Sequence, residues 1–165
     1  MKIKSKKELR FVLMADLMMN RGRFKWSAVD RLKNLFYPDF IMDFLKSMRY
    51  LSYYSEASNN RLAYYYWRRK YQKLSVRLGF SIGYNTLGYG VTIPHWGTIV
   101  IGASNRIGNY AVLHTSTCIQ DNGKVIGDGL YLSTGVKMTT KFDMGDNISI
   151  GANSVVNKQV GGGGI

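Results

Sequence analysis

The 165-residue sequence has few residues of several kinds that mark whole classes of protein. Its one cysteine, Cys118, excludes a disulfide within the chain and suits a reducing compartment. No window holds the roughly 18 consecutive apolar residues of a membrane-spanning helix. The basic N-terminus is not followed by the apolar run and cleavage site of a secretory signal. We therefore expect a cytoplasmic protein.

Acidic residues are also scarce, and the resulting positive charge lies in one half of the chain. Residues 1–77 hold 18 Lys or Arg against 6 Asp or Glu, whereas residues 78–165 hold 5 against 4. Such a half suits an anionic partner, or serves only as a solvated surface that keeps the protein soluble. No nucleic-acid motif accompanies the charge, so we expect no nucleic-acid partner. We also predict no metal site.

Residues 1–78 are predicted to form a basic helical region. Ser5 and Glu8 have the spacing of a capping box, and the apolar residues that follow recur at helical spacing up to Gly22. Further helices are expected over about residues 28–36, 39–54 and 61–78.

Aromatic residues in this region predict a second possible property, peripheral attachment to the inner face of the membrane. A mixture of cations and interfacial aromatics holds a protein on an anionic lipid surface. The alternative is that the aromatics pack between the helices and leave only the charges outside. The aromatics concerned are Tyr50, Tyr53, Tyr54, Tyr64, Tyr65, Tyr66 and Trp67.

A repeat of six residues replaces the helical period from about Gly79. Apolar anchors recur every six residues with one single-residue slip, often followed by glycine. This period predicts short strands separated by tight bends, with three strands in a coil of roughly 18 residues. We therefore expect a mainly β structure, a β-helix of about four to five coils over residues 79–160, with a Gly-rich tail over 161–165. The regular anchors are Ile101, Ile107, Leu113, Ile119, Ile126, Leu132, Met138, Met144, Ile150 and Val156.

Two segments of the repeat resemble a known superfamily, the hexapeptide-repeat acyltransferases. Residues 91–102 (VTIPHWGTIVIG) are similar to the histidine segment of serine O-acetyltransferases, and more closely to their relatives in capsule and other polysaccharide synthesis. Residues 148–158 (ISIGANSVVNK) are similar to the last coil of these enzymes. The resemblance implies a left-handed β-helix, acetyl-CoA as acyl donor, and a homotrimer that holds the donor between two subunits.

The resemblance also implies roles for individual residues. His95 matches the catalytic histidine, which would act as the general base that takes the proton of an acceptor hydroxyl. The alternative is a structural histidine at a coil corner. His114 would be a second polar contact for substrate, or purely structural. Ser133, Thr134 and Gly135 match contacts to the pantetheine arm of CoA, Ala152 and Asn153 lie one coil further, and Lys158 would meet a CoA phosphate.

The sequence departs from the serine acetyltransferase pattern at positions that bear on which molecule receives the acetyl group. Those enzymes carry an aspartate directly before the catalytic histidine and another fifteen residues upstream, where this chain has Pro94 and Phe80. Their loop with a second substrate-binding histidine is replaced by residues 121–126. We therefore expect the acceptor to be a sugar hydroxyl of a polysaccharide precursor. Serine O-acetyltransferase is the alternative within enzymes, and a non-catalytic trimeric scaffold is the alternative from another class.

Overall fold

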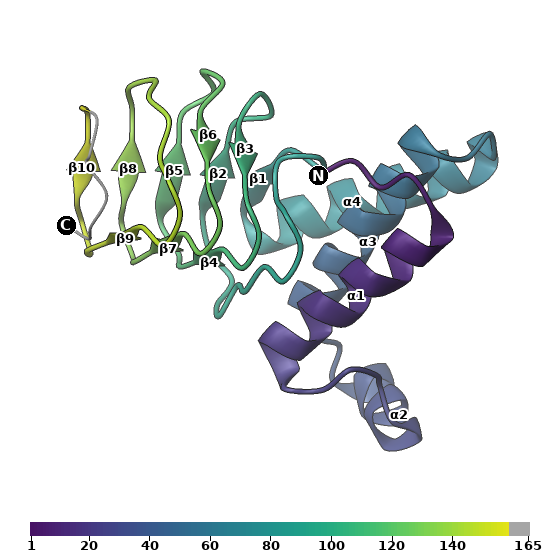
Figure 1. The fold of residues 1–165 in the computed structure, drawn as a ribbon. Coiled ribbons are helices and arrows are strands. Elements are labelled where there is room, and N and C mark those ends of the chain that lie inside the picture. The colour runs from purple at the N-terminus through teal and green to yellow at the C-terminus, as the bar shows by residue number, and fades with distance from the viewer. Residues whose placement is uncertain (159–165) are drawn as a thin grey trace.

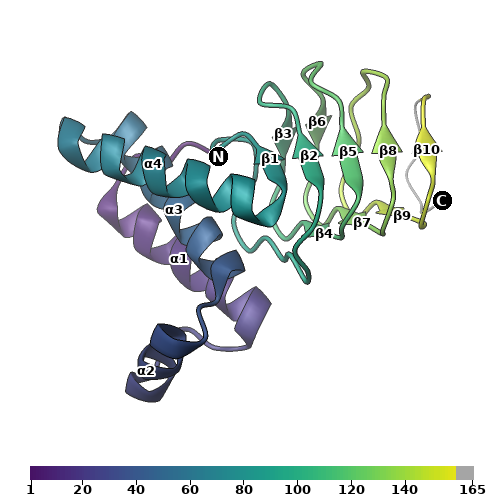
Figure 2. The same ribbon diagram turned by 180° about the vertical axis from the view of Figure 1, so that it is seen from behind.

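The computed structural model describes residues 1–158, so the predicted tail over 161–165 lies outside the described part. Four helices are followed by a stack of parallel coils, and the two parts meet at the first coil (Figures 1 and 2). The helices are α1 (Lys6–Arg21), α2 (Ala28–Phe36), α3 (Phe40–Glu56) and α4 (Arg61–Leu78). All four lie where the sequence predicts helices. Within residues 1–158, none is both long and apolar enough to cross a membrane.

The helix ends follow from local side-chain chemistry. The Ser5 hydroxyl accepts a hydrogen bond from the Glu8 backbone N–H at 3.1 Å, as expected for a cap. The Glu8 carboxylate accepts instead from the Lys4 N–H, so only half of the predicted capping box forms. α1 and α4 end at Gly22 and Gly79, whose φ angles of 67° and 77° favour glycine.

Within residues 1–158 the coils are built from ten short strands, and the pairs that these strands form are parallel. Sheet A has the order β1-β2-β5-β8-β10, sheet B contains β3 and β6, and sheet C has the order β4-β7-β9. The strands are β1 (Phe80–Ile82), β2 (Ile99–Ile101), β3 (Arg106–Ile107), β4 (Val112–Leu113), β5 (Thr117–Ile119), β6 (Val125–Ile126), β7 (Tyr131–Leu132), β8 (Lys137–Met138), β9 (Ser149–Ile150) and β10 (Val155–Val156). The chain visits the three sheets in turn, which gives a parallel β-helix of about four coils.

The interior of the β-helix is formed by the six-residue anchors. Every anchor from Ile101 to Val156 is buried, which confirms the predicted pattern. Each large aliphatic side chain removed from water contributes about 1.5–3 kcal/mol to the free energy of folding. The slip between Ile119 and Ile126 falls at a bend that also buries Lys124.

The helical region closes one end of the β-helix. Phe44 of α3 packs edge-to-face on Phe80 of β1, with ring centroids 5.0 Å apart, and stacks on Tyr71 of α4 at 5.4 Å. The hydroxyl of Tyr71 donates to the carbonyl of Ile82. The apolar core is therefore continuous from α3 and α4 into the first coil.

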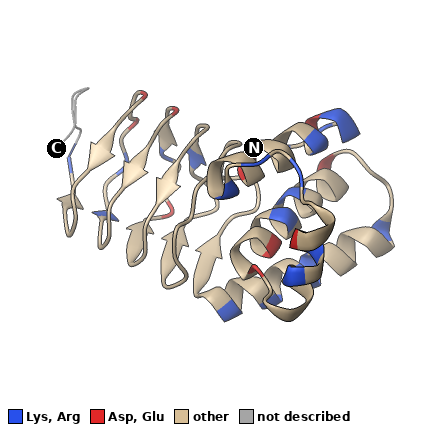
Figure 3. Ribbon diagram, turned by 90° about the horizontal axis from the view of Figure 1, so that it is seen from below, with Lys and Arg blue, Asp and Glu red and all other residues tan. Residues whose placement is uncertain are grey.

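The helical region holds most of the positive charge and the aromatic cluster of α3 and α4. Lys and Arg gather on the helices and are sparse on the coils (Figure 3). Several aromatics of α3 and α4 pack inward: Tyr53 is buried, and Tyr50 stacks on Trp67 with centroids 4.2 Å apart. Tyr65 and Tyr66 remain exposed. The packing alternative therefore accounts for much of this aromatic cluster.

Candidate active site

The predicted site residues lie along one edge of the β-helix, where each coil turns from sheet C into sheet A. These turns are residues 94–98, 114–116, 133–135 and 151–153, and we call them the corner column. They stack through the backbone, because the Gly135 N–H donates to the Thr115 carbonyl and the Asn153 N–H to that of Thr134. The fold thus brings His95, His114, Ser133, Thr134, Gly135, Ala152 and Asn153 onto one edge.

The first corner is longer than the corner stacked on it. Thr92 pairs with Val112 before the turn, whereas Ile99 pairs with Thr117 after it, so the first turn holds two additional residues. In Figure 1 the teal segment between β1 and β2 bulges beyond the row of corners. His95 and Trp96 lie in this bulge and are both exposed. An imidazole at such a position is open to a ligand.

Asn20 at the end of α1 fixes the backbone that leads into this bulge. Its side-chain amide donates to the Val91 carbonyl at 2.7 Å, and its side-chain carbonyl accepts from the Ile93 N–H at 3.2 Å. The carboxamide therefore replaces the neighbouring strand that the first coil lacks at the edge of sheet C. The second of these contacts lies two residues before His95.

A buried ion pair supports the same segment one turn earlier in α1. Asp16 and Arg49 are both fully buried, with Arg49 Nε 2.8 Å from Asp16 Oδ2. Asp16 Oδ1 also accepts from the Val91 N–H at 3.2 Å, and Arg49 Nη1 donates to the Leu87 carbonyl at 3.0 Å. Sequence reasoning missed these residues. The available signal was an acidic residue on the apolar face of the first helix, one turn after Val12.

His114 occupies a more ordered position than His95. Its side chain is half-buried, and its ring Nε2 lies 3.1 Å from the hydroxyl of Tyr131 on the next coil. Its backbone N–H donates to the Leu132 carbonyl, and its carbonyl accepts from the Thr117 hydroxyl. The predicted polar residue at this corner is thus held by a tyrosine that the sequence analysis did not identify.

The residues matched to CoA contacts divide into two places. Thr134, Ala152 and Asn153 are exposed on the corner column, and Gly135 has a φ of 83° with no room for a Cβ beside the Asn153 side chain. Lys158 instead follows β10, so it lies beyond the far end of the sheet A strand. The structure therefore groups Ser133, Thr134, Gly135, Ala152 and Asn153 but not Lys158.

Carboxylates are missing at the two places where the serine acetyltransferase pattern has them. Phe80 is buried against Phe44, and Pro94 is exposed in the bulge. Residues 121–124 form a bend between sheets A and B, where Asp121 accepts from the Ser104 N–H at 2.9 Å. Hydrogen bonds from Ser104 hold the pKa of this carboxyl below its usual range. Across residues 1–158 no group of three His, Cys, Asp or Glu side chains is placed to hold a metal.

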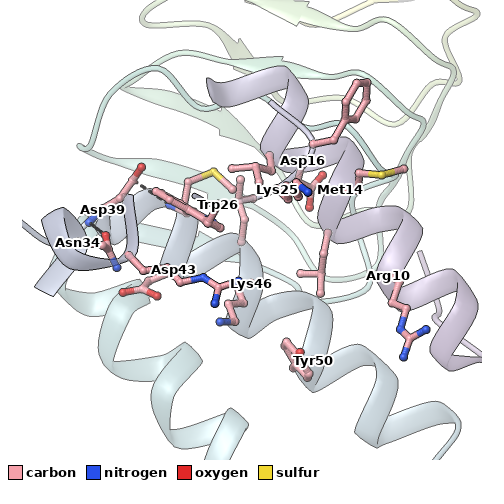
Figure 4. Close-up of a pocket in the computed structure, with 16 residues that line it drawn as sticks. Arg10, Met14, Asp16, Lys25, Trp26, Asn34, Asp39, Asp43, Lys46 and Tyr50 are labelled. Carbon is pink, nitrogen blue, oxygen red and sulfur yellow. Dashed lines mark hydrogen bonds between the residues drawn. The ribbon is translucent and has the colours of Figure 1, made fainter. Parts of the chain in front are cut away.

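A cavity of about 860 Å³ lies away from the corner column, among α1, α2 and α3 (Figure 4). Cations such as Arg10 and Lys46 and acids such as Asp39 and Asp43 surround an apolar floor that includes Trp26. None of its lining residues belongs to a coil, so this cavity is not the site that holds His95.

Serine acetyltransferases predominate among the known proteins to which the chain is similar, and one bifunctional GlmU protein also matches. No protein-family model matches the chain. The chain is 28% identical over 137 residues to a serine acetyltransferase of Buchnera aphidicola, an alignment of 73% of this chain and 50% of that protein. It is 30% identical over 81 residues to the serine acetyltransferase of Synechococcus elongatus, covering 45% of this chain and 33% of that protein. The chain thus spans half or less of these curated relatives.

Solved structures of serine acetyltransferases share the fold. A complex with CoA superposes with a TM-score of 0.66 at 20% identity, over 91% of this chain and 62% of that one. The Neisseria gonorrhoeae enzyme in complex with serine gives 0.64 at 23% identity, over 91% and 62%. These neighbours identify the parallel coils as the predicted left-handed β-helix. Relatives and neighbours together support the hexapeptide-repeat acyltransferase superfamily, and within it they match the serine acetyltransferases better than the capsule and polysaccharide branch.

Proposed function

We propose that the chain is an acetyl-CoA-dependent O-acetyltransferase with His95 as its general base. The observation that carries the proposal is the placement of an exposed histidine in the bulged first corner, at the head of the corner column. The serine acetyltransferase relatives, aligned over 73% of the chain in one case, support the same reaction class. A reaction that uses acetyl-CoA would take place in the cytoplasm.

Acetyl transfer requires a general base close to the hydroxyl group that receives the acetyl group. His95 takes the hydroxyl proton as the oxygen attacks the thioester carbonyl. The C–S bond of the thioester then breaks, and the CoA thiolate takes the proton from the His95 imidazolium. A neutral imidazole suits both transfers near neutral pH. His114, held by Tyr131 on the next coil, would supply a fixed polar contact to the reacting group.

The corner column would hold the donor. Its exposed residues and backbone groups offer hydrogen bonds to the amides of the pantetheine arm, with Ser133, Thr134, Gly135, Ala152 and Asn153 as the contacts. Gly135 keeps the edge narrow, because a side chain there would meet Asn153. Lys158, beyond β10, would contact a CoA phosphate only from outside the column.

L-serine and a sugar hydroxyl are each supported as the acetyl acceptor, by different observations. We place L-serine first, because the relatives with the stated activity are serine acetyltransferases. A sugar hydroxyl is the second candidate, because Phe80 and Pro94 supply no carboxylate to hold the ammonium group of an amino acid.

An acetyl-transfer assay tests the proposal and ranks the acceptors. CoA release from acetyl-CoA is measured with L-serine and, separately, with a panel of nucleotide sugars and polysaccharide precursors. Efficient acetyl transfer to L-serine would exclude a sugar as the acceptor, and acetyl transfer only to a sugar would exclude L-serine. If no acceptor works and CoA does not bind even at millimolar concentration, the non-catalytic scaffold replaces the enzyme.

A further inference from the structure

α2 is amphipathic, with its apolar residues on one side. At roughly 100° per residue, the apolar positions fall within an arc of about 120°. Arg31 and Lys33 border this arc on its two sides, and Asp30 and Asn34 lie opposite. The apolar positions within the helix are Ala28, Val29, Leu32, Leu35 and Phe36.

This apolar side points away from the protein. No residue of α2 is buried. The opposite side faces the body: Asn34 accepts from the Asp39 N–H at 2.7 Å, and Arg31 and Asn34 line the cavity toward α1 and α3 (Figure 4). α2 projects from the rest of the helical region in both ribbon views (Figures 1 and 2). The orientation is the reverse of that expected for a helix packed on a soluble core.

Tyr37, directly after α2, adds to the exposed apolar residues and is 86% exposed. The four large apolar side chains within α2 are 60–73% exposed. Isolated exposed apolar residues are ordinary, but contiguous ones indicate an interaction site. We call this set the α2 apolar face: Val29, Leu32, Leu35, Phe36 and Tyr37.

The charge around the α2 apolar face is positive. Residues 21–37 carry five Lys or Arg and a single acid, Asp30. Arg21 pairs with Asp39, and Arg23 pairs with Asp30. Lys25, Arg31 and Lys33 form no ion pair with another residue in the part of the chain that the structure describes. Lys25 and Arg31 line the cavity, whereas Lys33 borders the α2 apolar face on its outer side. A complementary partner must therefore combine an apolar layer with negative charge.

A second copy of this chain meets only one of these two requirements. It would offer apolar surface, but it would also bring two strongly basic helical regions together, which like-charge repulsion opposes. An anionic bilayer meets both, because acyl chains lie just beneath acidic headgroups.

We propose that the α2 apolar face inserts into the headgroup region of an anionic membrane, with Lys33 at its border on the acidic headgroups. The lipid-facing surface is thus α2 rather than the aromatic cluster of residues 50–67, where Tyr50 and Trp67 stack on each other. Attachment through α2 involves no residue of the corner column and does not depend on acetyl transfer.

Vesicle flotation of the full chain tests the proposal. Phosphatidylcholine vesicles with and without phosphatidylglycerol are compared at low and high salt. We expect binding only to the anionic vesicles and a decrease with salt. Leu35→Ser should weaken the partition constant about tenfold, since it removes one inserted leucine side chain. Lys33→Ala should weaken it about fivefold.

Leu62→Ser is the matched control, because Leu62 is 85% exposed on α4, outside the α2 apolar face. It should bind like the unaltered chain, and circular dichroism should show that all variants fold. Equal loss of vesicle binding in Leu35→Ser and Leu62→Ser would overturn the assignment. Binding that is the same with and without phosphatidylglycerol would also overturn it. So would a change of oligomer mass in Leu35→Ser, which would make the face a contact between copies. Absence of binding to any vesicle would also overturn it and point to an acidic protein partner.

Discussion

The two histidines of the chain occupy successive corners of the β-helix, yet their surroundings differ. His95 lies exposed in a turn lengthened by two residues, whereas His114 is half-buried with its ring 3.1 Å from the Tyr131 hydroxyl. A base must approach a substrate hydroxyl and exchange its proton, which an open position permits. A residue that only orients a reacting group benefits from being held in place.

Tyr131→Phe tests the positioning of His114. The change removes one hydroxyl and keeps the ring, so the fold should be unaffected. A typical net hydrogen bond contributes about 1 kcal/mol, so we expect kcat to fall about fivefold with KM for acetyl-CoA unchanged. Steady-state kinetics with a verified acceptor provide the measurement. A rise in KM at constant kcat would instead assign Tyr131 to donor binding.

Asp16→Asn tests the buried ion pair that joins α1 to the first coil. It leaves Arg49 buried without its counter-charge, which typically costs about 3–5 kcal/mol. Asp43→Asn is the matched control, because Asp43 pairs with Lys70 at 3.5 Å with both side chains partly exposed, and such pairs contribute at most about 1 kcal/mol. Urea unfolding measures both. Equal effects would mean that the Asp16–Arg49 pair does not anchor the helical region.

At the scale of elements, α2 depends on one cap for its N-terminus. The Ser27 hydroxyl accepts from the Asp30 N–H, and the Asp30 carboxylate accepts from the Ser27 N–H. Hydrogen bonds from the Ser27 hydroxyl and backbone, followed by Arg23, lower the pKa of Asp30 from 3.8 to about 2. The carboxylate form is therefore favoured in the capped helix.

The lowered pKa predicts how α2 responds to acid. Because the folded-state pKa of Asp30 is below its unfolded value, its contribution is complete above about pH 4 and is lost as the pH falls toward 2. We expect the NMR amide signals of residues 28–31 to shift toward unfolded values in that interval. Asp30→Asn should abolish the transition. A transition of these signals near pH 4 in the unaltered chain would show that the cap does not form.

The helices and strands could be predicted from the sequence more fully than the contacts that they make with one another. The period of six places the anchors of the coils, because each inward position must be apolar, and the helix limits follow from Ser5, Gly22 and Gly79. The longer first corner could not be predicted, because it depends on which strands pair. Nor could the outward apolar side of α2, because periodicity shows that a helix has an apolar side but not what that side faces.

The candidate site shows the same division between local and long-range information. His95 was found through its motif, and the corner column follows from the coil period. Asn20 could not be identified, because its partner lies 73 residues away in the chain. Tyr131 lies 17 residues from His114, close to one coil, so the repeat places it on the next coil but does not show that its hydroxyl meets the His114 ring. The acceptor depends on groups around His95 that the motif does not specify.

At the scale of the whole molecule, the corner column is an open edge. A single chain offers one side of a groove, so enclosure of a donor requires a second subunit. The resemblance to the hexapeptide-repeat acyltransferases implies three copies, so we predict a homotrimer in solution, in which each corner column faces a neighbouring copy. Multi-angle light scattering should give three times the mass of the chain. A stable monomer that retains transfer activity would contradict this arrangement.

The central claim is that His95 is the base of an acetyl transfer whose donor is held by the corner column. His95→Ala, measured in parallel for kcat with a verified acceptor and for CoA affinity by calorimetry, tests it most directly. We predict that kcat falls by about two to four orders of magnitude while CoA binds as tightly as to the unaltered chain. Turnover close to that of the unaltered chain would show that His95 is not the base.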